Sequence, residues 1–362
     1  MNPNHQRNNP QVSIQKSTYN DIDLESLLNP FGGIQKYIKN GERVLLKTNL
    51  LTPSTPEKAV VTHPAVIGAV AQAILEIGGI PYIGDSPSGQ FTKRRLEKTY
   101  EKAGVKDLAN KLGIELNYDT SSQKIIIPHG KKLKKTNLCN FVLNADKIIA
   151  LPKIKTHSFM IMTLATKIMY GVIPGLTKAK YHSMFIKKAA FADMLLDVLS
   201  VRKPDLIIMD GIVGMQGDGP SGGTPVNLKV LLASEDAIAM DLAVCDILGI
   251  EPIGVPTLRQ AKIRKLWPPK ISYPLLSPTD IKYINFLLPS TADYLITGRK
   301  KPNRSPIPTA KCTACGLCEE ICPKRAIKII NPRAQVDYTK CRLCYCCQET
   351  CPYDAIKLEV IK

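Results

Sequence analysis

Nine of the eleven cysteines of this 362-residue chain lie within 40 residues near its C-terminal end. They form two runs, CTACGLCEEICP at residues 312–323 and CRLCYCCQETCP at residues 341–352, and both fit the pattern C-x2-C-x2-C-x3-C-P. The runs belong to an internal repeat with a period of 29 residues, in which Pro323 aligns with Pro352. Each copy therefore predicts the same small unit: a cysteine loop, a short helix and a strand.

This spacing is typical of proteins that bind four-iron four-sulfur clusters, because a tight loop with two-residue gaps presents three thiolates to one cluster while the fourth reaches the other. The predicted ligands of one cluster are Cys312, Cys315, Cys318 and Cys351, and those of the second are Cys341, Cys344, Cys347 and Cys322. Structural zinc sites usually show two separated cysteine pairs, and a chain without an export signal has little need of disulfides. Two 4Fe-4S clusters are therefore the predicted cofactors.

One cysteine departs from the repeat. Cys346 stands where the first run has Leu317, so that two cysteines are adjacent in the second run. In register, Cys347 is the ligand and Cys346 is a spare thiol, but ligand exchange between the neighbours stays open. The two isolated cysteines, Cys139 and Cys245, are expected to be small core residues.

The chain divides into segments of different composition. Residues 297–311 hold three prolines and five cations without periodicity, which predicts a basic, proline-rich linker over residues 297–309. It precedes the ferredoxin domain, residues 310–362, a small α+β unit with two clusters. Before it we expect a polar N-terminal segment, residues 1–42, and a ligand-binding domain, residues 43–296.

The ligand-binding domain alternates short apolar strands with helical stretches. RVLLKTNLL, IPYIGD and KIIALPKI are strand-like, whereas HPAVIGAVAQAILEIG and FMIMTLATKIMYG are expected to be helices. This alternation is typical of an α/β fold in which a mostly parallel sheet carries helices on both faces. Ligands of such folds bind beyond the C-terminal ends of the strands.

The strand ends carry polar residues that define a candidate site. Lys153, Lys155 and His157 occupy alternate positions of one extended segment and are expected to share a face. Two ammonium groups and an imidazole predict a clamp for a carboxylate or phosphate, although a basic surface turn is the alternative. The predicted substrate-binding residues are Lys47, Asn49, Asp85, Lys153, Lys155 and Lys167, and the predicted catalytic proton donors are His157 and His182.

Two glycine-rich loops, GDSPSG at residues 84–89 and GDGPSGGTP at residues 217–225, could also approach a ligand closely. Neither matches a Walker loop or the dinucleotide fingerprint. Glycine with proline marks turns first of all, so phosphate binding is the less favoured interpretation of both loops.

The net charge of +18 bears on partners. Residues 310–362 hold nine Lys/Arg and six Asp/Glu, so that most of the excess belongs to residues 1–309, where it is dispersed. A dispersed excess indicates a solvated surface or an anionic partner, and 6% aromatic residues without a recognition motif argue against nucleic acid. The N-terminus lacks a signal pattern and the most apolar window is broken by Glu76, so we expect no membrane span and a cytoplasmic location.

Taken together, these motifs resemble the family known as domain of unknown function 362, in its subgroup with a C-terminal two-cluster ferredoxin domain. The matching pieces are Lys47-Thr48-Asn49, THP at 62–64, GGIPYIGDSPSG at 78–89, LPKIKTH at 151–157, ATKIMYGVIPG at 165–175 with His182, GMQGDGPSGGTP at 214–225 and DAIAMD from Asp236. The resemblance implies an iron–sulfur protein with ferredoxin-type electron transfer and a basic pocket, and supplies no substrate. The layout is more loosely similar to the nickel-dependent lactate racemase family, although no nickel-ligand pattern is present.

The leading functional hypothesis is an oxidoreductase that passes electrons through two clusters to an anionic substrate or cofactor. The alternative is a non-enzymatic electron carrier or cluster-delivery subunit that docks an acidic protein partner. The third hypothesis is a nucleic-acid-associated iron–sulfur protein. Each of the first two requires a redox partner protein, and the sequence leaves open whether the chain is an enzyme.

Overall fold

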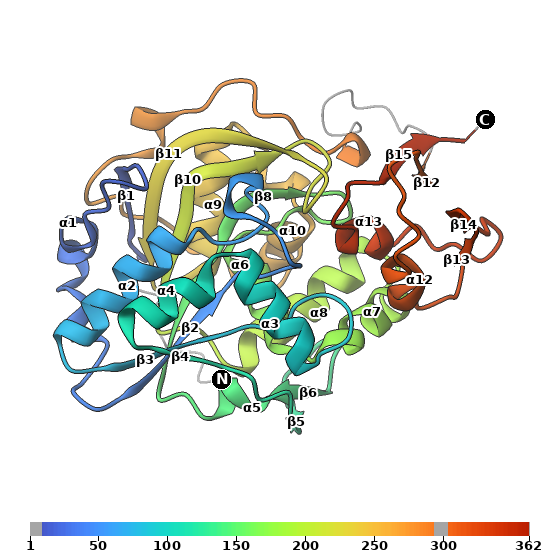
Figure 1. Cartoon of the computed structure of the whole chain (residues 1–362). Helices are drawn as coiled ribbons and strands as arrows, with labels where there is room; N and C mark the ends of the chain where they lie inside the picture. Colours follow the sequence, from blue (N-terminus) through green and yellow to red (C-terminus); the bar gives the residue numbers. More distant parts are fainter. Residues whose placement is uncertain (1–8, 293–302, 362) are drawn as a thin grey trace.

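A computed structural model describes residues 9–292 and 303–361 of the chain. It shows a larger part built on a nine-stranded sheet and a small C-terminal part that carries the cysteine runs. The C-terminal part packs beside helix α7 (Gly175–Met184), at one end of the larger part (Figure 1). Within the described ranges, no helix has the length and apolarity needed to cross a bilayer.

The main sheet is mostly parallel. Its strands follow the order β1 (Val12–Lys16), β11 (Thr224–Ser234), β10 (Leu206–Gln216), β7 (Lys147–Leu151), β2 (Arg43–Thr48), β3 (Ile80–Gly84) and β4 (Glu115–Leu116). From β10 to β4 the neighbours run parallel, whereas β11 pairs antiparallel with both β1 and β10. After Pro152 the chain continues from β7 into β8 (Lys153–His157), which pairs with β10 and with β9 (Ile161–Met162).

Helices cover both faces of this sheet, as the alternation of apolar strands and helices predicts. In β2, Val44 and Leu46 belong to one hydrophobic core and Leu45 to the other, because successive strand side chains point to opposite faces. One face packs against α1 (Leu24–Leu28), α2 (Pro64–Glu76), α3 (Lys93–Lys102) and α4 (Val105–Leu112). The other packs against α5 (Asn140–Leu143), α6 (Leu164–Ile168), α8 (Lys188–Val201), α9 (Ala237–Leu248) and α10 (Pro256–Ile263). The predicted α/β fold class is confirmed.

Local sequence explains where the helices begin and end. His63 precedes α2 and its Nδ1 accepts a hydrogen bond from the Ala65 N–H, while Pro64 opens the first turn. Asp236 caps α9 in the same way, and that helix stops at Gly249, whose φ of 64° favours glycine.

The segment from Phe159 to Gly171 is not the single helix that its composition predicts. It holds the short strand β9, then α6, then the 3-10 turn Met169–Val172. Ile161 and Leu164 have positive φ values of 68° and 46°, which interrupt any helix. The Asp241 carboxylate, from α9, instead accepts the N–H groups of Ala165 and Thr166 in the first turn of α6 at 2.7 and 3.1 Å, so a long-range contact determines where this helix starts.

The C-terminal part repeats one unit twice. The helices α12 (Leu317–Ile321) and α13 (Cys346–Thr350) and the strands β13 (Ile327–Ile330) and β15 (Ile356–Val360) occupy equivalent positions of the 29-residue repeat. Strand β13 pairs with β14 (Arg333–Val336), and β15 pairs with β12 (Arg304–Pro308). The predicted order of cysteine loop, short helix and strand is confirmed in both copies.

Two predicted segment boundaries do not coincide with these elements. The segment 1–42 contains β1 and α1, and burial of Val12 and Ile14 makes β1 an edge strand of the main sheet. Of the predicted linker 297–309, residues 297–302 lie outside the described residues, whereas β12 belongs to the C-terminal part. Prolines are accommodated in β12 because it is an edge strand, where a missing N–H need not break a ladder.

Candidate functional site

A cavity of about 60 Å³ lies beyond the carboxyl ends of β2, β3 and β7. Its lining contains all six residues predicted to bind a substrate, Lys47, Asn49, Asp85, Lys153, Lys155 and Lys167, together with Ser86, Tyr170 and Lys178. We call it the lysine cavity. The structure therefore brings together residues from positions 47 to 178 of the chain, while their binding role stays a prediction.

Lys47 and Asp85 form one wall of the lysine cavity. Lys47 Nζ lies 2.8 Å from Asp85 Oδ1, and both side chains are almost fully buried. Asp85 also accepts hydrogen bonds of 2.7 Å from the N–H groups of Leu50 and Ser86. Its carboxylate is thus saturated by protein donors, and it orients Lys47 and the two adjoining loops.

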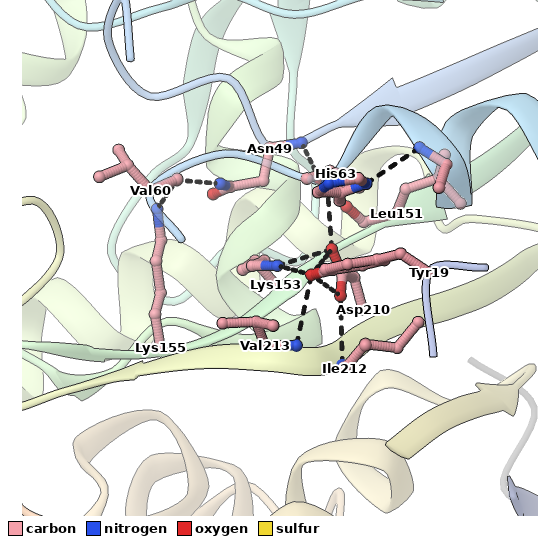
Figure 2. A network of polar contacts seen from close by, with 12 residues as sticks. Tyr19, Asn49, Val60, His63, Leu151, Lys153, Lys155, Asp210, Ile212 and Val213 are labelled. Carbon is pink, nitrogen blue, oxygen red and sulfur yellow. Dashed lines mark hydrogen bonds and ion pairs between the residues drawn. The ribbon is translucent and has the colours of Figure 1, made fainter. Parts of the chain in front are cut away.

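Lys153 and Asp210 form a second buried ion pair, with 2.7 Å between Nζ and Oδ2 and no exposure of either side chain. Figure 2 shows how Tyr19 joins them: its hydroxyl accepts from Lys153 at 2.8 Å and donates to Asp210 at 3.1 Å. The Tyr19 ring stacks on His63 with 3.6 Å between centroids. Burial and the charge of Asp210 raise the pKa of Tyr19, and burial lowers the pKa of Lys153 against the opposing effect of Asp210.

Lys178 closes the cavity from α7. Its ammonium donates to Ser86 O, Ser86 Oγ and Ile173 O at 2.7 to 2.8 Å, so all three of its N–H bonds are used. Burial lowers the pKa of Lys178 to about 8. The side chain ties the loop at residues 84–89 to helix α7.

Within residues 9–292 and 303–361, no carboxylate is bound to Lys155 or Lys167. Lys155 is 1% exposed, and its Nζ makes one hydrogen bond, to Val60 O at 2.7 Å (Figure 2). Among the described residues, Lys167 Nζ makes no hydrogen bond and lies 5.6 Å from the centre of the Tyr170 ring. Burial lowers the pKa of both, and that of Lys155 falls well below its ordinary value because Lys167 is also near. An ammonium group in such a cavity that no carboxylate of the described residues contacts is an indication of a binding site.

Gly171 permits the close approach of the first wall. A Cβ at this position would lie 2.4 Å from Asp85 Oδ1 and 2.6 Å from Lys47 Nζ. We expect Gly171→Ala to destabilise the protein by about 1–3 kcal/mol, because the buried pair must move to accept a methyl group. Urea unfolding measures the loss. Ser88→Ala, which alters another lining residue without adding volume, should change little, and an unchanged Gly171→Ala stability would contradict this packing.

His157 and His182 do not line the lysine cavity. Both are buried, and burial lowers the pKa of His157 to about 4 and that of His182 to about 3. Lys153 and His157 lie at opposite ends of a five-residue strand, about 13 Å apart, which is more than a small cavity spans. His157 instead places Nε2 3.0 Å from Glu349 Oε1 of α13, and His182 packs against Phe191. This placement does not support direct proton delivery by either histidine.

The two glycine-rich loops have different surroundings. Ser86 and Ser88 of the first loop line the lysine cavity. The second loop contacts both parts of the protein: Gln348 Nε2 of α13 donates to Asp218 O at 2.7 Å, and Ser158 N, just after β8, donates to Gly219 O at 2.8 Å. Its Pro220 also lines the lysine cavity. The second loop therefore attaches the C-terminal part to the sheet domain.

The cysteines surround two further cavities, and each contains one of the ligand sets expected from the ferredoxin arrangement. The first is lined by Cys312, Cys315, Cys318 and Cys351, and the second by Cys322, Cys341, Cys344, Cys346 and Cys347. Across residues 9–292 and 303–361, no group of three or more His, Cys, Asp or Glu side chains is placed to hold a single metal ion. A cluster fits the two cysteine cavities because it occupies the space between its four thiolates.

Backbone N–H groups support the same fit. Ala326 N donates to Cys322 Sγ at 3.1 Å, and at the equivalent repeat position Ala355 N donates to Cys351 Sγ at 3.3 Å. Hydrogen bonds to the ligand sulfurs stabilise thiolates and tune cluster potentials. The isolated Cys139 and Cys245 are fully buried in the sheet domain, as expected.

Cys346 and Cys347 face different surroundings. Burial and the neighbouring thiols of Cys344, Cys341, Cys318 and Cys322 raise the pKa of Cys347, which lines the second cysteine cavity. Cys346 lines the same cavity and also packs against Ala179 of α7. Together with the register of the repeat, this contact with α7 favours Cys347 as the ligand.

Some residues of the site escaped the analysis of strand ends. Lys178 does not follow any strand that the sequence indicates, and Tyr19 lies in the predicted polar N-terminal segment. Glu349 lies between two predicted ligands, and its repeat counterpart Glu320 is exposed, so the sequence carried no sign that it would be buried.

Comparisons with known proteins agree with these motifs. Residues 306–328 match the 4Fe-4S binding domain family, so the chain is an iron–sulfur protein. Residues 44–246, more than half of the chain, match the family described as Domain of unknown function (DUF362), and the chain belongs to that family. The resemblance inferred from the sequence motifs is thereby confirmed.

The chain is also similar to the thylakoid-associated protein sll1697 of Synechocystis sp. (strain ATCC 27184 / PCC 6803 / Kazusa). The two are 36% identical over 275 residues, which cover 74% of this chain and 82% of the relative. Among solved structures, the lactate racemase apoprotein from Thermoanaerobacterium thermosaccharolyticum matches with a TM-score of 0.43 and 15% identity. That match covers 65% of this chain and 56% of the racemase chain.

Proposed function

We propose that the protein is an oxidoreductase that passes electrons through two 4Fe-4S clusters to a small anionic substrate in the lysine cavity. The predicted ligands of one cluster are the four cysteines of the first cysteine cavity. Those of the other, in the second cysteine cavity, are Cys322, Cys341, Cys344 and Cys347. When bound, the clusters would supply single-electron transfer.

One observation carries this proposal: helix α7 borders both the lysine cavity and the second cysteine cavity. Lys178 lines the first of these and Ser183 the second. The two residues are five positions apart, or about 7.5 Å along the helix axis. Between them Ala179 packs against Cys346. A substrate in the lysine cavity would therefore sit close to the second cluster.

The protein residues would bind the substrate and stabilise its reduced form. Ammonium groups in a buried site attract an anion and stabilise negative charge that develops on it. The Lys153 ammonium lines the cavity and donates a hydrogen bond to the Tyr19 hydroxyl, whereas His157 and His182 lie outside the lining. We therefore assign proton supply to Lys153, which Tyr19 orients, in preference to the histidines.

The electron donor would be a partner protein that docks near the first cysteine cavity. All residues that line this cavity belong to the C-terminal part, and Cys315 is exposed. The proposed location is the cytoplasm. Because a relative is named as thylakoid-associated, attachment to a membrane-bound partner is the alternative.

An anaerobic experiment tests the proposal. The protein is reduced chemically, a filtered metabolite extract is added, and cluster reoxidation is followed by visible absorbance with mass spectrometry of the consumed compound. We expect reoxidation by the wild type and by Lys180→Met, an exposed lysine of α7, and none by the Lys155→Met/Lys167→Met double variant. Absence of reoxidation with intact clusters would contradict the proposal and favour an electron carrier that reduces an acidic protein.

A further inference from the structure

We propose that the lysine cavity binds a doubly charged oxyanion, the phosphate group of a small ester, and that Lys155 and Lys167 are the residues that hold it. This inference rests on the proposed function in one respect, since it takes the occupant of the cavity to be the substrate. Binding itself requires no electron transfer and can be tested alone.

The hydrogen bonds inside the cavity determine which lysines are available. Lys178 uses all three N–H bonds within the protein, and Lys47 and Lys153 each use two, one of them to a carboxylate. Lys155 uses one of its three, and Lys167 uses none among the described residues. Up to five N–H donors of these last two side chains therefore remain for oxygen atoms of a ligand.

The charges of the site set the charge of the ligand. Five lysines line the cavity, whereas three carboxylates, Asp85, Asp210 and Glu349, lie beside them. Glu349 is counted as the third carboxylate because its Oε1 lies 3.0 Å from His157 Nε2, on the side of α13. The remaining excess is two positive charges when every lysine is protonated, and a dianion balances it. A bound dianion also favours the charged form of Lys155.

The oxygens of the neighbouring carboxylates already have protein donors. Asp85 is the carboxylate that lines the cavity, and its oxygens accept from Lys47 and two backbone N–H groups. Asp210 is turned toward Lys153, Tyr19 and the N–H of His63. The oxygens of both carboxylates are thus engaged by protein donors. Among the described residues, two N–H bonds of Lys155 and all three of Lys167 have no protein acceptor.

The cavity volume limits the part of the ligand that is enclosed. About 60 Å³ has room for roughly four water molecules. That space suits a phosphate group and is far smaller than a nucleotide. The rest of a phosphate ester would extend toward the opening of the cavity.

Two substitutions test the inference with little structural cost. Lys167→Met removes an ammonium that makes no hydrogen bond in the described protein. Lys155→Met removes one donor to Val60 O, but Asn49 Nδ2 still donates to that oxygen at 2.7 Å. Lys180→Met, on the exposed side of α7, is the matched control. Thermal unfolding and cluster absorbance verify that each variant is folded and loaded.

Calorimetric titration of the oxidised full-length protein with inorganic phosphate and methyl phosphate gives the affinity. We expect both to bind, and each lysine variant to weaken binding about tenfold to a hundredfold, because each removes charged hydrogen bonds to the oxyanion. Lys180→Met should bind like the wild type. Acetate, with one charge, should bind at least tenfold more weakly than phosphate.

Three results would overturn the inference: no binding of either phosphate compound, binding that both lysine variants retain, or tighter binding of the dicarboxylate malonate than of phosphate. These outcomes are separate from the proposed function. Phosphate binding without reoxidation by metabolites would contradict the oxidoreductase and leave this site standing. Reoxidation without phosphate binding would contradict this ligand class and leave the oxidoreductase standing.

Discussion

Cys347→Ser should reduce the iron content from about eight to about four atoms per chain, because it removes a thiolate of the second cluster and leaves the first ligand set complete. Serine is a poor replacement, since its oxygen is a hard ligand that stays protonated at neutral pH. Reoxidation by a substrate should also be lost, because the second cysteine cavity is the one that shares α7 with the lysine cavity. Iron analysis and visible absorbance of the anaerobically purified protein measure the first effect.

Cys346→Ser is the matched control for this prediction. The residue is adjacent in sequence and equally a cysteine, but its side chain packs against Ala179. We expect this variant to keep about eight iron atoms per chain. If Cys346→Ser lost iron and Cys347→Ser did not, the register of the second run would be wrong by one residue. If neither lost iron, the two-cluster arrangement itself would be contradicted.

The cysteine part of the molecule could be predicted in detail because its information is local. Spacing within each run, together with the 29-residue repeat, determines both the helix positions and the grouping of cysteines around two cavities. Only the contacts between the C-terminal part and the sheet domain could not be predicted from the sequence. Glu349 contacts His157 across nearly 200 positions of sequence, and no local pattern carries such a pairing.

The sequence predicts those residues of the lysine cavity that lie at the ends of strands. Lys47, Asp85 and Lys153 follow or begin strands whose carboxyl ends meet at one edge of the sheet, so the rule for α/β folds places them together. The same rule does not distinguish a lysine that is free to bind a ligand from one that forms an ion pair with a carboxylate of the protein. That distinction depends on Asp85 and Asp210, whose partners become apparent only when the chain has folded.

His157 shows the limit of the alternation rule. It occupies an alternate position of the same strand as Lys153 and Lys155, so the sequence predicts that all three side chains bind one ligand. A strand advances about 3.3 Å per residue, so the third side chain reaches a different neighbour, α13. Tyr19 was missed because it follows β1, and β1 joins the sheet only by pairing with β11, more than 200 residues later in the sequence. No local pattern indicates this pairing.

Asp210→Ala should destabilise the protein by about 3–5 kcal/mol, the cost of leaving a buried charge without its partner. Asp210 accepts from four donors: Lys153 Nζ at 2.7 Å, Tyr19 OH at 3.1 Å, His63 N at 3.0 Å and Ile212 N at 3.3 Å. Both charged side chains are fully buried, so water cannot replace the lost carboxylate. Equilibrium unfolding in urea measures the change.

Two further variants separate the lost charge partner from the lost side chain. Glu115→Ala breaks the exposed pair with Arg43, whose side chains are 44% and 56% exposed, and should cost about 0–1 kcal/mol. The double variant Lys153→Met/Asp210→Leu removes both buried charges and should recover much of the loss of Asp210→Ala, because no ammonium is then left without a counter-ion. A double variant as unstable as Asp210→Ala would show that packing and the two backbone N–H groups dominate. If Asp210→Ala lost no more stability than Glu115→Ala, the buried ion pair would be contradicted. The assignment of Lys153 to that pair, which leaves Lys155 and Lys167 to bind the ligand, would then also be wrong.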